Sequence, residues 1–488
     1  MLVRRKKIGF FLGPLIFLLI LIFLPDNSIL QPAAVKVAAV ASLMTIWWIT
    51  EAIPIPATAL LPLALFPGLG VLSAKEASAP YAHHLIFLFM GGFLIAIAME
   101  KWNLHRRVAL HTIKLVGFSS RRIILGFMVA TAFLSMWISN TATTMMMVPI
   151  GLAVIKQTVE FIKKSGDYDI NTTPPNFKFG TALMLGIAYA ASIGGVATII
   201  GTPPNTIMVG FVEQTYHVHI KFAQWMLFGL PLAVIMLFVA WVYLTRFASV
   251  PEIDQLPGGK ELLVSELKKL GKMKKAECYV LTVFAIVAAL WISRGFVHLG
   301  PSTIHDATIA MAGAIALFLI PVDWKRGVFV LDWQSAVRLP WDVIFLFGGG
   351  LALAKGFSES GLARWIGTQL AVLQGTNIML IIFLVIILSM LLTEVTSNTA
   401  TAAIIIPVMG SVAIAMHVHP FLLIIPAGVA ASYAFMLPVA TPPNAIVFGS
   451  RYLTIPQMAR IGVILNLIGS VLITLLVKFV LPHIWNLK

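Results

Sequence analysis

Two copies of a Ser-Asn-Thr sequence stand in the middle of long apolar stretches. Residues 139–141 lie inside the stretch 122–155, and residues 397–399 lie inside the stretch 378–416. Polar side chains in such stretches are costly, and a broken helix is tolerated there only when it is buried in protein or lines a cavity. Amide groups at a helix start attract anions, and freed carbonyl oxygens bind a hard cation such as Na⁺. A lone Ser or Thr would be interpreted as a helix contact, but the duplicated motif predicts a binding site.

Two proline pairs mark further breaks. Residues 201–205 read Gly-Thr-Pro-Pro-Asn, and residues 440–444 read Ala-Thr-Pro-Pro-Asn. Consecutive prolines remove two backbone donors and clash with the preceding turn, so a helix must break there. We therefore expect discontinuous helices that meet the two Ser-Asn-Thr hairpins at one site.

These motifs recur in one order along the chain. An offset of 258 residues relates the two Ser-Asn-Thr sequences and also the Ile-Phe-Leu-Phe sequences at 86 and 344, and an offset of 239 relates the proline pairs. Each copy would hold five spans and one re-entrant hairpin, and an odd number of spans inverts the second copy. The sequence predicts inverted-topology repeats at 33–246 (hairpin 122–155) and 277–488 (hairpin 378–416).

The amino-acid composition indicates whether these elements fold in water or in a lipid bilayer. The chain has 488 residues, 59% hydrophobic and only 11% charged, with a mean hydropathy of +0.95. A soluble domain carries about a quarter charged residues, so soluble, disordered and secreted disulfide-rich proteins are excluded. The one cysteine, Cys278, excludes an intramolecular disulfide and a Cys-rich metal site. The sequence predicts an all-α polytopic membrane protein.

The basic residues predict how the chain crosses the bilayer. With a cytoplasmic N-terminus, 26 of the 34 Lys and Arg residues fall on the cytoplasmic side, as the positive-inside rule requires. The net charge of +15 is thus a topology signal and does not indicate nucleic-acid binding. Residues 1–32 form an N-terminal transmembrane helix, 247–276 form a surface-lying cytoplasmic linker, and the C-terminus is outside. We expect eleven spans, at 8–24, 33–50, 54–72, 84–100, 180–212, 224–245, 277–296, 306–322, 341–357, 421–448 and 461–482.

The hairpins lack basic residues. No Lys or Arg occurs at 123–155 or at 378–417. A dianion brought to the midplane needs countercharge, and co-bound Na⁺ is the simplest supply. Glu394 is expected to orient its hairpin or to balance a cation, and Glu51 is the other acid expected at membrane depth. The histidines at the outer boundary are interpreted as interfacial, and Gly348–Gly350 as a site of close helix packing.

Together with residues 48–60, these motifs resemble the divalent anion/sodium symporter family, which includes Na⁺-coupled dicarboxylate and citrate carriers. The resemblance covers about residues 35–485. It implies a homodimer in the bacterial cytoplasmic membrane, with a scaffold domain and an elevator-type transport domain in each protomer. It also implies at least two co-transported Na⁺ ions and a small dicarboxylate substrate.

The resemblance assigns roles to matched residues. The Na⁺ sites would use Ser135, Ser139, Asn140 and Gly201 in one repeat and Thr393, Thr396, Asn398 and Ala440 in the other. The substrate would meet Ser139, Asn140, Thr141, Thr202, Pro203, Ser397, Asn398, Thr399, Thr441 and Pro442. Thr396 stands where relatives often carry a smaller residue.

Several alternatives stay open. Na⁺-independent exchangers in the family tend to carry a basic residue where this chain has Thr143 and Thr401, which favours symport. Thr141 and Thr399 favour a carboxylate over sulfate, whereas succinate, malate, fumarate and citrate are not separated. A membrane-embedded enzyme would need a nucleophile, paired carboxylates or a metal constellation at membrane depth, and none is recognisable. A channel is disfavoured because two inverted motif sets around one site indicate alternating access.

Overall fold

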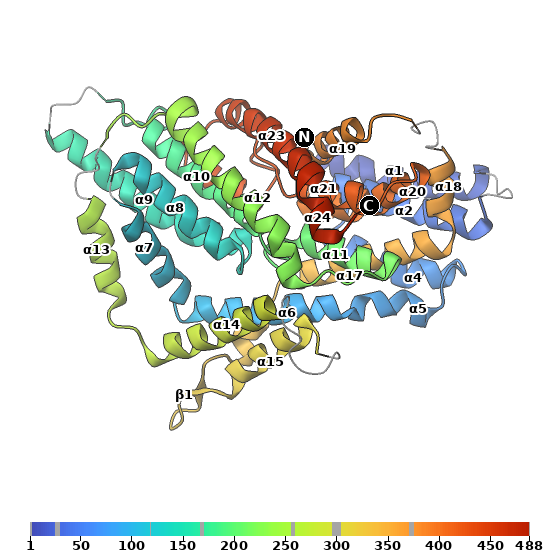
Figure 1. Ribbon diagram of the computed structural model, residues 1–488, viewed down its shortest axis with the longest axis horizontal. Helices are drawn as coiled ribbons and strands as arrows, with labels where there is room; N and C mark the ends of the chain where they lie inside the picture. Colours follow the sequence, from blue (N-terminus) through green and yellow to red (C-terminus); the bar gives the residue numbers. More distant parts are fainter. Residues whose placement is uncertain are drawn as a thin grey trace.

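The computed structural model describes residues 2–24, 30–117, 119–165, 170–254, 259–294, 304–369 and 375–487. These stretches fold almost wholly into α-helices (Figure 1). The first half contains α1 (Leu2–Phe23), α2 (Pro32–Thr50), α3 (Ile55–Thr58), α4 (Leu61–Gly68), α5 (Ala74–Ser78), η1 (Ala79–Ala82), α6 (His84–Lys101), α7 (Leu104–Val116), α8 (Ser120–Ser135), α9 (Asn140–Ser165), α10 (Lys178–Gly195), α11 (Pro203–Tyr216), α12 (Phe222–Tyr243) and η2 (Leu244–Ala248).

The second half begins within the predicted linker at 247–276. It contains α13 (Gly259–Leu270), α14 (Lys275–Ser293), α15 (Asp306–Leu319), β1 (Pro321–Asp323), β2 (Val328–Phe329), α16 (Trp333–Ala336), α17 (Trp341–Glu359), α18 (Leu362–Gln369), α19 (Ile378–Val395), α20 (Asn398–Ala415), α21 (Phe421–Ala430), α22 (Pro442–Phe448), α23 (Ile455–Phe479) and α24 (Leu481–Trp485). The strands form one small antiparallel pair. Each of the four predicted segments has residues outside the described stretches, namely 1 and 25–29 of the N-terminal segment, 118 and 166–169 of the first repeat, 255–258 of the linker, and 295–303, 370–374 and 488 of the second repeat.

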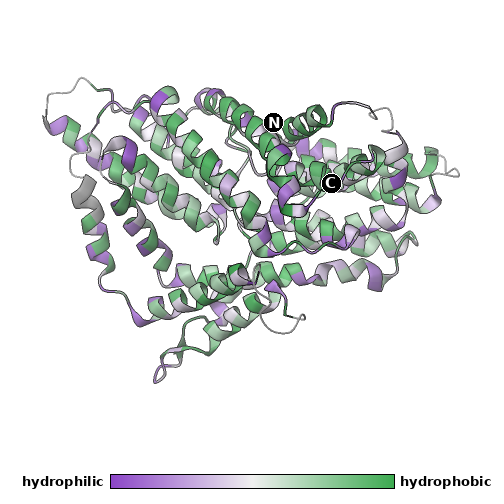
Figure 2. Ribbon diagram, viewed as in Figure 1, coloured by the Kyte–Doolittle hydropathy of each residue, from purple (hydrophilic) through white to green (hydrophobic). Residues whose placement is uncertain are grey.

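The helices present apolar surface to their surroundings. Nine helices of the described stretches are long and apolar enough to cross a membrane. Figure 2 shows hydrophobic residues along the outer faces of the helices, and large side chains such as Phe11, Phe238 and Leu384 are more than half exposed. Exposure of such apolar surface to water is unfavourable, whereas its contact with the hydrocarbon of a bilayer is not. The prediction of an all-α multi-pass membrane protein is confirmed, apart from the two short strands.

The prediction of one continuous span at 54–72 is wrong. That segment forms two short helices, α3 and α4. Pro54, Pro56 and Pro62 are close enough together to remove successive helix hydrogen bonds, so no long helix can form there. The helices at 306–322 and 421–448 are likewise shorter than predicted, and the number of crossings stays a prediction.

Both Ser-Asn-Thr motifs lie where two helices meet at a tight turn. Residues 136–139 join α8 to α9, and residues 396–397 join α19 to α20. At the second turn the Ser397 hydroxyl caps α20 by accepting a hydrogen bond from the Ala400 N–H at 3.3 Å, and Ser139 accepts from the Ala142 N–H at 3.2 Å in the same way. Serine stabilises a helix start because its oxygen satisfies an N–H group that has no partner within the helix.

Both proline pairs end a helix break, as predicted. Residues 196–202 separate α10 from α11, and residues 431–441 separate α21 from α22. In the first break the Asn205 amide donates to the carbonyl oxygens of Val196 and Thr198 at 3.1 and 2.8 Å. Asn444 donates to two carbonyl oxygens of the second break, each at 3.0 Å. The same residue type thus satisfies the exposed carbonyls in both halves.

Glycines allow backbones to touch near these breaks. A Cβ on Gly349 would lie 2.3 Å from the Ala59 carbonyl oxygen, and a Cβ on Gly194 would lie 2.3 Å from the Ala132 carbonyl oxygen. The close packing predicted for the glycine run at 348–350 is confirmed. Gly194 has the same role between α10 and the hairpin arm α8, which pack along each other (Figure 1).

We predict that Gly194→Ala lowers the thermal stability of the detergent-solubilised protein, because the added methyl group would force the backbones of α8 and α10 apart. Overpacking of this kind costs about 1–3 kcal/mol. The midpoint of thermal unfolding, followed by size-exclusion chromatography, measures it. Gly68→Ala is the control, because a Cβ at Gly68 meets no atom within 4 Å. Equal midpoints for the two variants would contradict this interpretation of the contact.

Candidate functional site

A cavity of about 670 Å³ lies between the tips of both hairpins and both helix breaks. Residues from both sequence repeats line it. All ten side chains assigned to the substrate are among the lining residues, and these are Ser139, Asn140, Thr141, Thr202, Pro203, Ser397, Asn398, Thr399, Thr441 and Pro442. The fold therefore brings together, in one place, motifs that are up to 303 residues apart in the sequence.

Four helices begin at this cavity. Helices α9 and α20 start at Asn140 and Asn398, and helices α11 and α22 start at Pro203 and Pro442. The first N–H groups of a helix have no partner within it, and they carry the positive end of the helix dipole. Helices α9 and α20 offer such N–H groups, whereas α11 and α22 begin with two prolines and offer the dipole without an N–H at those positions. Convergent helix starts of this kind are suited to bind an anion.

The cavity wall supplies no cationic side chain. Among its described lining residues there is no Lys or Arg, while Glu51 and Asp342 both contribute carboxylates. Glu51 ends α2 in the left-handed conformation and pairs with Arg5 and Lys6 of α1 at 3.3 and 3.7 Å. Glu51 is 39% exposed and paired with both cations, so its charge is largely compensated, and its depth in the membrane stays a prediction.

Four oxygen atoms converge behind the first hairpin tip. The Ser135 hydroxyl oxygen lies 2.6 Å from Asn140 Oδ1 and 2.7 Å from the Ala191 carbonyl oxygen. The Asn140 amide position facing Ser135 is also 3.2 Å from the carbonyl oxygens of Ala191 and Gly201. Oxygens bound to one cation at about 2.3–2.6 Å would be about 3.2–3.7 Å apart in octahedral geometry. The two 3.2 Å separations fit this range, whereas the 2.6 and 2.7 Å separations from the Ser135 oxygen are hydrogen-bond distances that would have to lengthen around a bound cation.

The Asn140 amide can satisfy this cluster in two ways. With its oxygen toward Ser135, it adds one more acceptor to the carbonyls of Ala191 and Gly201. Turned over, its nitrogen donates hydrogen bonds to both carbonyls and to Ser135. The first orientation suits a bound cation, and the second suits a cluster without one.

A corresponding cluster lies behind the second hairpin tip. The Thr393 hydroxyl oxygen lies 2.7 Å from Asn398 Oδ1 and 2.8 Å from the Ala431 carbonyl oxygen. Ala440, also assigned to this site, lines the adjoining cavity. Thr396 is placed differently, because its hydroxyl donates to the Leu392 carbonyl and contacts the Thr401 hydroxyl at 2.5 Å. No described hydrogen bond of Thr396 joins it to Asn398.

Glu394 holds the second hairpin against the second helix break. Its carboxylate accepts hydrogen bonds from the N–H groups of Phe435, Met436 and Leu437 at 2.8–3.0 Å, and from the Asn466 amide at 2.8 Å. A buried carboxylate with four donors is well satisfied. The expectation that Glu394 orients its hairpin agrees with these contacts.

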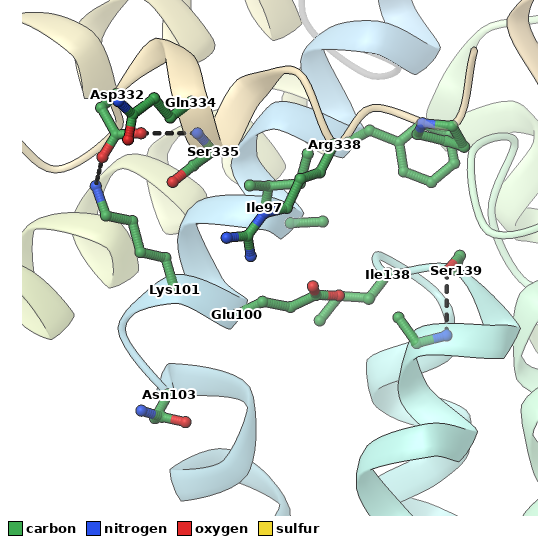
Figure 3. Close-up of a pocket in the computed structure, with 14 residues that line it drawn as sticks. Ile97, Glu100, Lys101, Asn103, Ile138, Ser139, Asp332, Gln334, Ser335 and Arg338 are labelled. Carbon is green, nitrogen blue, oxygen red and sulfur yellow. Dashed lines mark hydrogen bonds and ion pairs between the residues drawn. The ribbon is translucent and has the colours of Figure 1, made fainter.

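A second cavity, of about 730 Å³, adjoins the first (Figure 3). The two share Phe93, Ser139 and Pro340 in their walls. Charged side chains from α6 and from the segment before α17 line it, and they are Glu100, Lys101, Asp332 and Arg338. The Lys101 ammonium is 2.7 Å from Asp332 Oδ2, and this hydrogen bond lowers the pKa of Asp332 to about 2.

Sequence reasoning missed some of these contributors. Lys101 and Arg338 were assigned to a side of the membrane and not to a cavity, although their positions at the ends of spans were visible in the sequence. The carbonyl oxygens of Ala191 and Ala431 carry no sequence signal, because any residue supplies that atom.

Comparisons with known proteins identify the family of the chain. The sequence profile described as the sodium:sulfate symporter transmembrane region matches residues 5–485. A protein of Staphylococcus saprophyticus named sodium-dependent dicarboxylate transporter SdcS is 49% identical over 485 residues, covering 98% of this chain and 92% of the relative. The protein of the same name from Staphylococcus aureus strain USA300 is 48% identical over 482 residues, covering 98% and 91%.

Two solved structures share the fold at low sequence identity. The Alcanivorax borkumensis YdaH transporter aligns with a TM-score of 0.58 at 12% identity, covering 91% of this chain and 99% of that one. Neisseria gonorrhoeae MtrF, described among antimetabolite efflux pumps, aligns with a TM-score of 0.57 at 11% identity, covering 86% of each chain. Since the family profile spans nearly the whole sequence and the relatives are almost half identical, the chain belongs to the sodium:sulfate symporter family.

Proposed function

We propose that this protein is a secondary active transporter that carries C4-dicarboxylates, or related di- and tricarboxylates, together with Na⁺. The observation that carries the proposal is the cavity lined by both Ser-Asn-Thr tips, with an oxygen cluster behind each tip. The name of the SdcS relatives supports the same substrate class and the same coupling ion.

The two ends of the site suit a molecule with an acidic group at each end. Asn140 and Thr141 stand at one hairpin tip, and Asn398 and Thr399 stand at the other. Each tip offers amide and hydroxyl donors beside a helix start, which supports binding of one carboxylate per tip. Succinate, malate and fumarate have two carboxylates and fit this arrangement.

The shared asparagines would couple the ion to the substrate. Asn140 belongs both to the first oxygen cluster and to the cavity wall. With Na⁺ in the cluster, the amide oxygen turns toward the ion and leaves the nitrogen free to donate to a carboxylate. Without Na⁺, the nitrogen turns to the carbonyls of Ala191 and Gly201, and the oxygen would then repel the substrate. Na⁺ therefore supplies both countercharge and a donor orientation.

The site also supports an alternating-access cycle. The charged cavity with Lys101 and Arg338 adjoins the substrate cavity on the side that the basic residues predict to be cytoplasmic. This supports an inward-open state with re-entrant hairpins that move in an elevator-type transport domain against a scaffold. We further propose the repeat boundaries 33–246 and 277–488, a cytoplasmic N-terminus, an outer C-terminus and a homodimer.

Uptake into proteoliposomes loaded with buffer alone tests the coupling. We expect radiolabelled succinate to accumulate with an inward Na⁺ gradient and not with an inward K⁺ gradient, because only Na⁺ supplies the countercharge. Empty liposomes are the control. Uptake in neither salt until succinate is loaded inside would identify a Na⁺-independent exchanger and overturn the proposal.

Replacing either shared asparagine tests the site. We expect Asn140→Ala and Asn398→Ala each to abolish Na⁺-driven uptake, because each removes a donor to the substrate and an oxygen from a cluster. Asn171→Ala is the matched control, since Asn171 lies on an exposed segment and bonds only to nearby Thr173 in the described contacts. Normal uptake by both hairpin variants would show that neither asparagine belongs to the transport site, and would contradict the proposed location.

The hydroxyls behind the tips separate ion binding from substrate binding. We expect Ser135→Ala and Thr393→Ala to raise the Na⁺ concentration for half-maximal uptake about 5- to 150-fold, the equivalent of about 1–3 kcal/mol for one lost buried partner. Ser389→Ala is the control, because Ser389 is equally buried on α19 but bonds only to the Val385 carbonyl. An unchanged Na⁺ dependence together with a raised KM for succinate would show that these hydroxyls serve the substrate alone.

A further inference from the structure

Three histidines and a glutamate gather outside the lining of the substrate cavity. They are His84, Glu213, His219 and His305. His84 Nε2 lies 3.4 Å from one carboxylate oxygen of Glu213, and His219 Nδ1 lies 3.3 Å from the other. The His305 ring lies 5.4 Å from the His84 ring and 5.6 Å from the His219 ring, between centroids.

Three different parts of the chain supply these side chains. His84 is the first residue of α6, and Glu213 lies in the last turn of α11. His217 then adopts the left-handed conformation, with φ at 57°, and this turn returns the chain so that His219 faces Glu213. His305 directly precedes α15.

A buried aspartate positions the third part. Asp306 accepts a hydrogen bond from the Phe222 N–H at 3.2 Å and pairs with Arg294 at 2.7 Å. Because Phe222 begins α12, this contact holds the start of α15 beside the connection that carries His219. The cluster is therefore built by the fold and not by one flexible segment.

The ring nitrogens have few other partners. Among the described residues, His84 Nε2, both ring nitrogens of His219 and Nδ1 of His305 are buried atoms without a hydrogen-bond partner, apart from the approaches to Glu213. Imidazole nitrogens usually find a donor or an acceptor, so such a group is unusual. The side chains of His84, Glu213 and His219 are 20–33% exposed, and a small ion can reach them.

The spacing suits a tetrahedral metal ion. Ligands bound at about 2.0–2.1 Å in a tetrahedron are about 3.4 Å apart. His84 Nε2 lies 3.4 Å from one Glu213 oxygen, which fits this spacing, whereas His219 Nδ1 lies 3.3 Å from the other oxygen and would have to shift to share the same ligand atom. The ligand atoms of His84, His219 and His305 all lie within 4.8 Å of one another, as do those of His83, His84 and Glu213. Small rotations of the rings would close the remaining distances.

We propose that His84, Glu213, His219 and His305 form a binding site for a transition-metal ion such as Zn²⁺, separate from the Na⁺ clusters. Imidazole ligands select Zn²⁺, Ni²⁺ or Cu²⁺ over the oxygen-seeking ions Mg²⁺ and Ca²⁺. The two triads of ligand atoms share His84 and draw on three segments of the chain.

A bound metal would add a link between α11 and α6, whereas α6 and α15 already pack closely, since a Cβ on Gly91 would lie 2.6 Å from the Ala310 backbone. Glu213 lies ten residues beyond Pro203, where the same helix α11 begins at the substrate cavity. A metal held by Glu213 together with His84 and His305 would tie α11 to α6 and α15. If α11 moves during transport, as the proposed function requires, the ion would inhibit uptake from the predicted outer side.

Calorimetry tests the site independently of transport. The probe is Zn²⁺, titrated into the purified full-length protein in detergent without Na⁺ or succinate. We expect one ion per chain, and we expect His219→Ala and His305→Ala each to weaken binding by at least about 10- to 100-fold. Mg²⁺ should give no comparable binding.

A variant of a histidine outside the cluster is the control. His419→Ala removes a partly buried ring that bonds to the nearby Phe421 N–H and lies outside the cluster, and Zn²⁺ affinity should not change. Thermal unfolding without zinc checks that His219→Ala and His305→Ala are folded. Equal Zn²⁺ affinity in the wild type and in both folded cluster variants would overturn the site.

Uptake tests the functional consequence. External Zn²⁺ should inhibit Na⁺-driven succinate uptake by the wild type and have little effect on His305→Ala. Zinc binding without any inhibition would overturn the tie between α11 and α6 but leave the site intact. Absence of Na⁺-driven uptake in every condition would instead overturn the proposed function, and the calorimetric result would still decide the metal site.

Discussion

A helix that breaks inside an apolar environment must satisfy every carbonyl and amide that the break releases, and the structure around the central cavity depends on this constraint. Asn205 and Asn444 each satisfy carbonyls of one break, and Glu394 satisfies three N–H groups of the second. These fixed partners leave the helix starts and a few oxygens directed at the cavity. The polar groups that face the cavity are therefore those that take no part in these structural hydrogen bonds.

The two halves meet this constraint with the same scheme and different residues. Where the second hairpin has Glu394, the first has Met136, whose carbonyl oxygen accepts a hydrogen bond from the Thr198 hydroxyl at 2.6 Å. Ser135 in one cluster corresponds to Thr393 in the other. The second break is thus held by a carboxylate, and the first by neutral groups such as the Thr198 hydroxyl and the Asn205 amide.

The features predicted best from the sequence were those with an unmistakable local cause. Paired prolines broke both helices, and Ser-Asn-Thr marked both turns, because these residues determine the local backbone whatever surrounds them. The predicted span at 54–72 failed because hydropathy was weighted above its spaced prolines. The partners of Glu394 and the role of the Ala191 carbonyl could not be foreseen, since they depend on tertiary placement and on backbone atoms common to all residues.

The contact between Gly194 and Ala132 affects how the cation cluster responds to motion. Ser135 and Asn140 flank the hairpin tip, whereas Ala191 and Gly201 belong to α10 and the break after it. Because backbone touches backbone at Gly194, no side-chain rotation can absorb a displacement between these two elements. If the cluster holds Na⁺ as proposed, its oxygens would be carried as a unit through the proposed transport movement, and the preference for one cation would not change with the conformation.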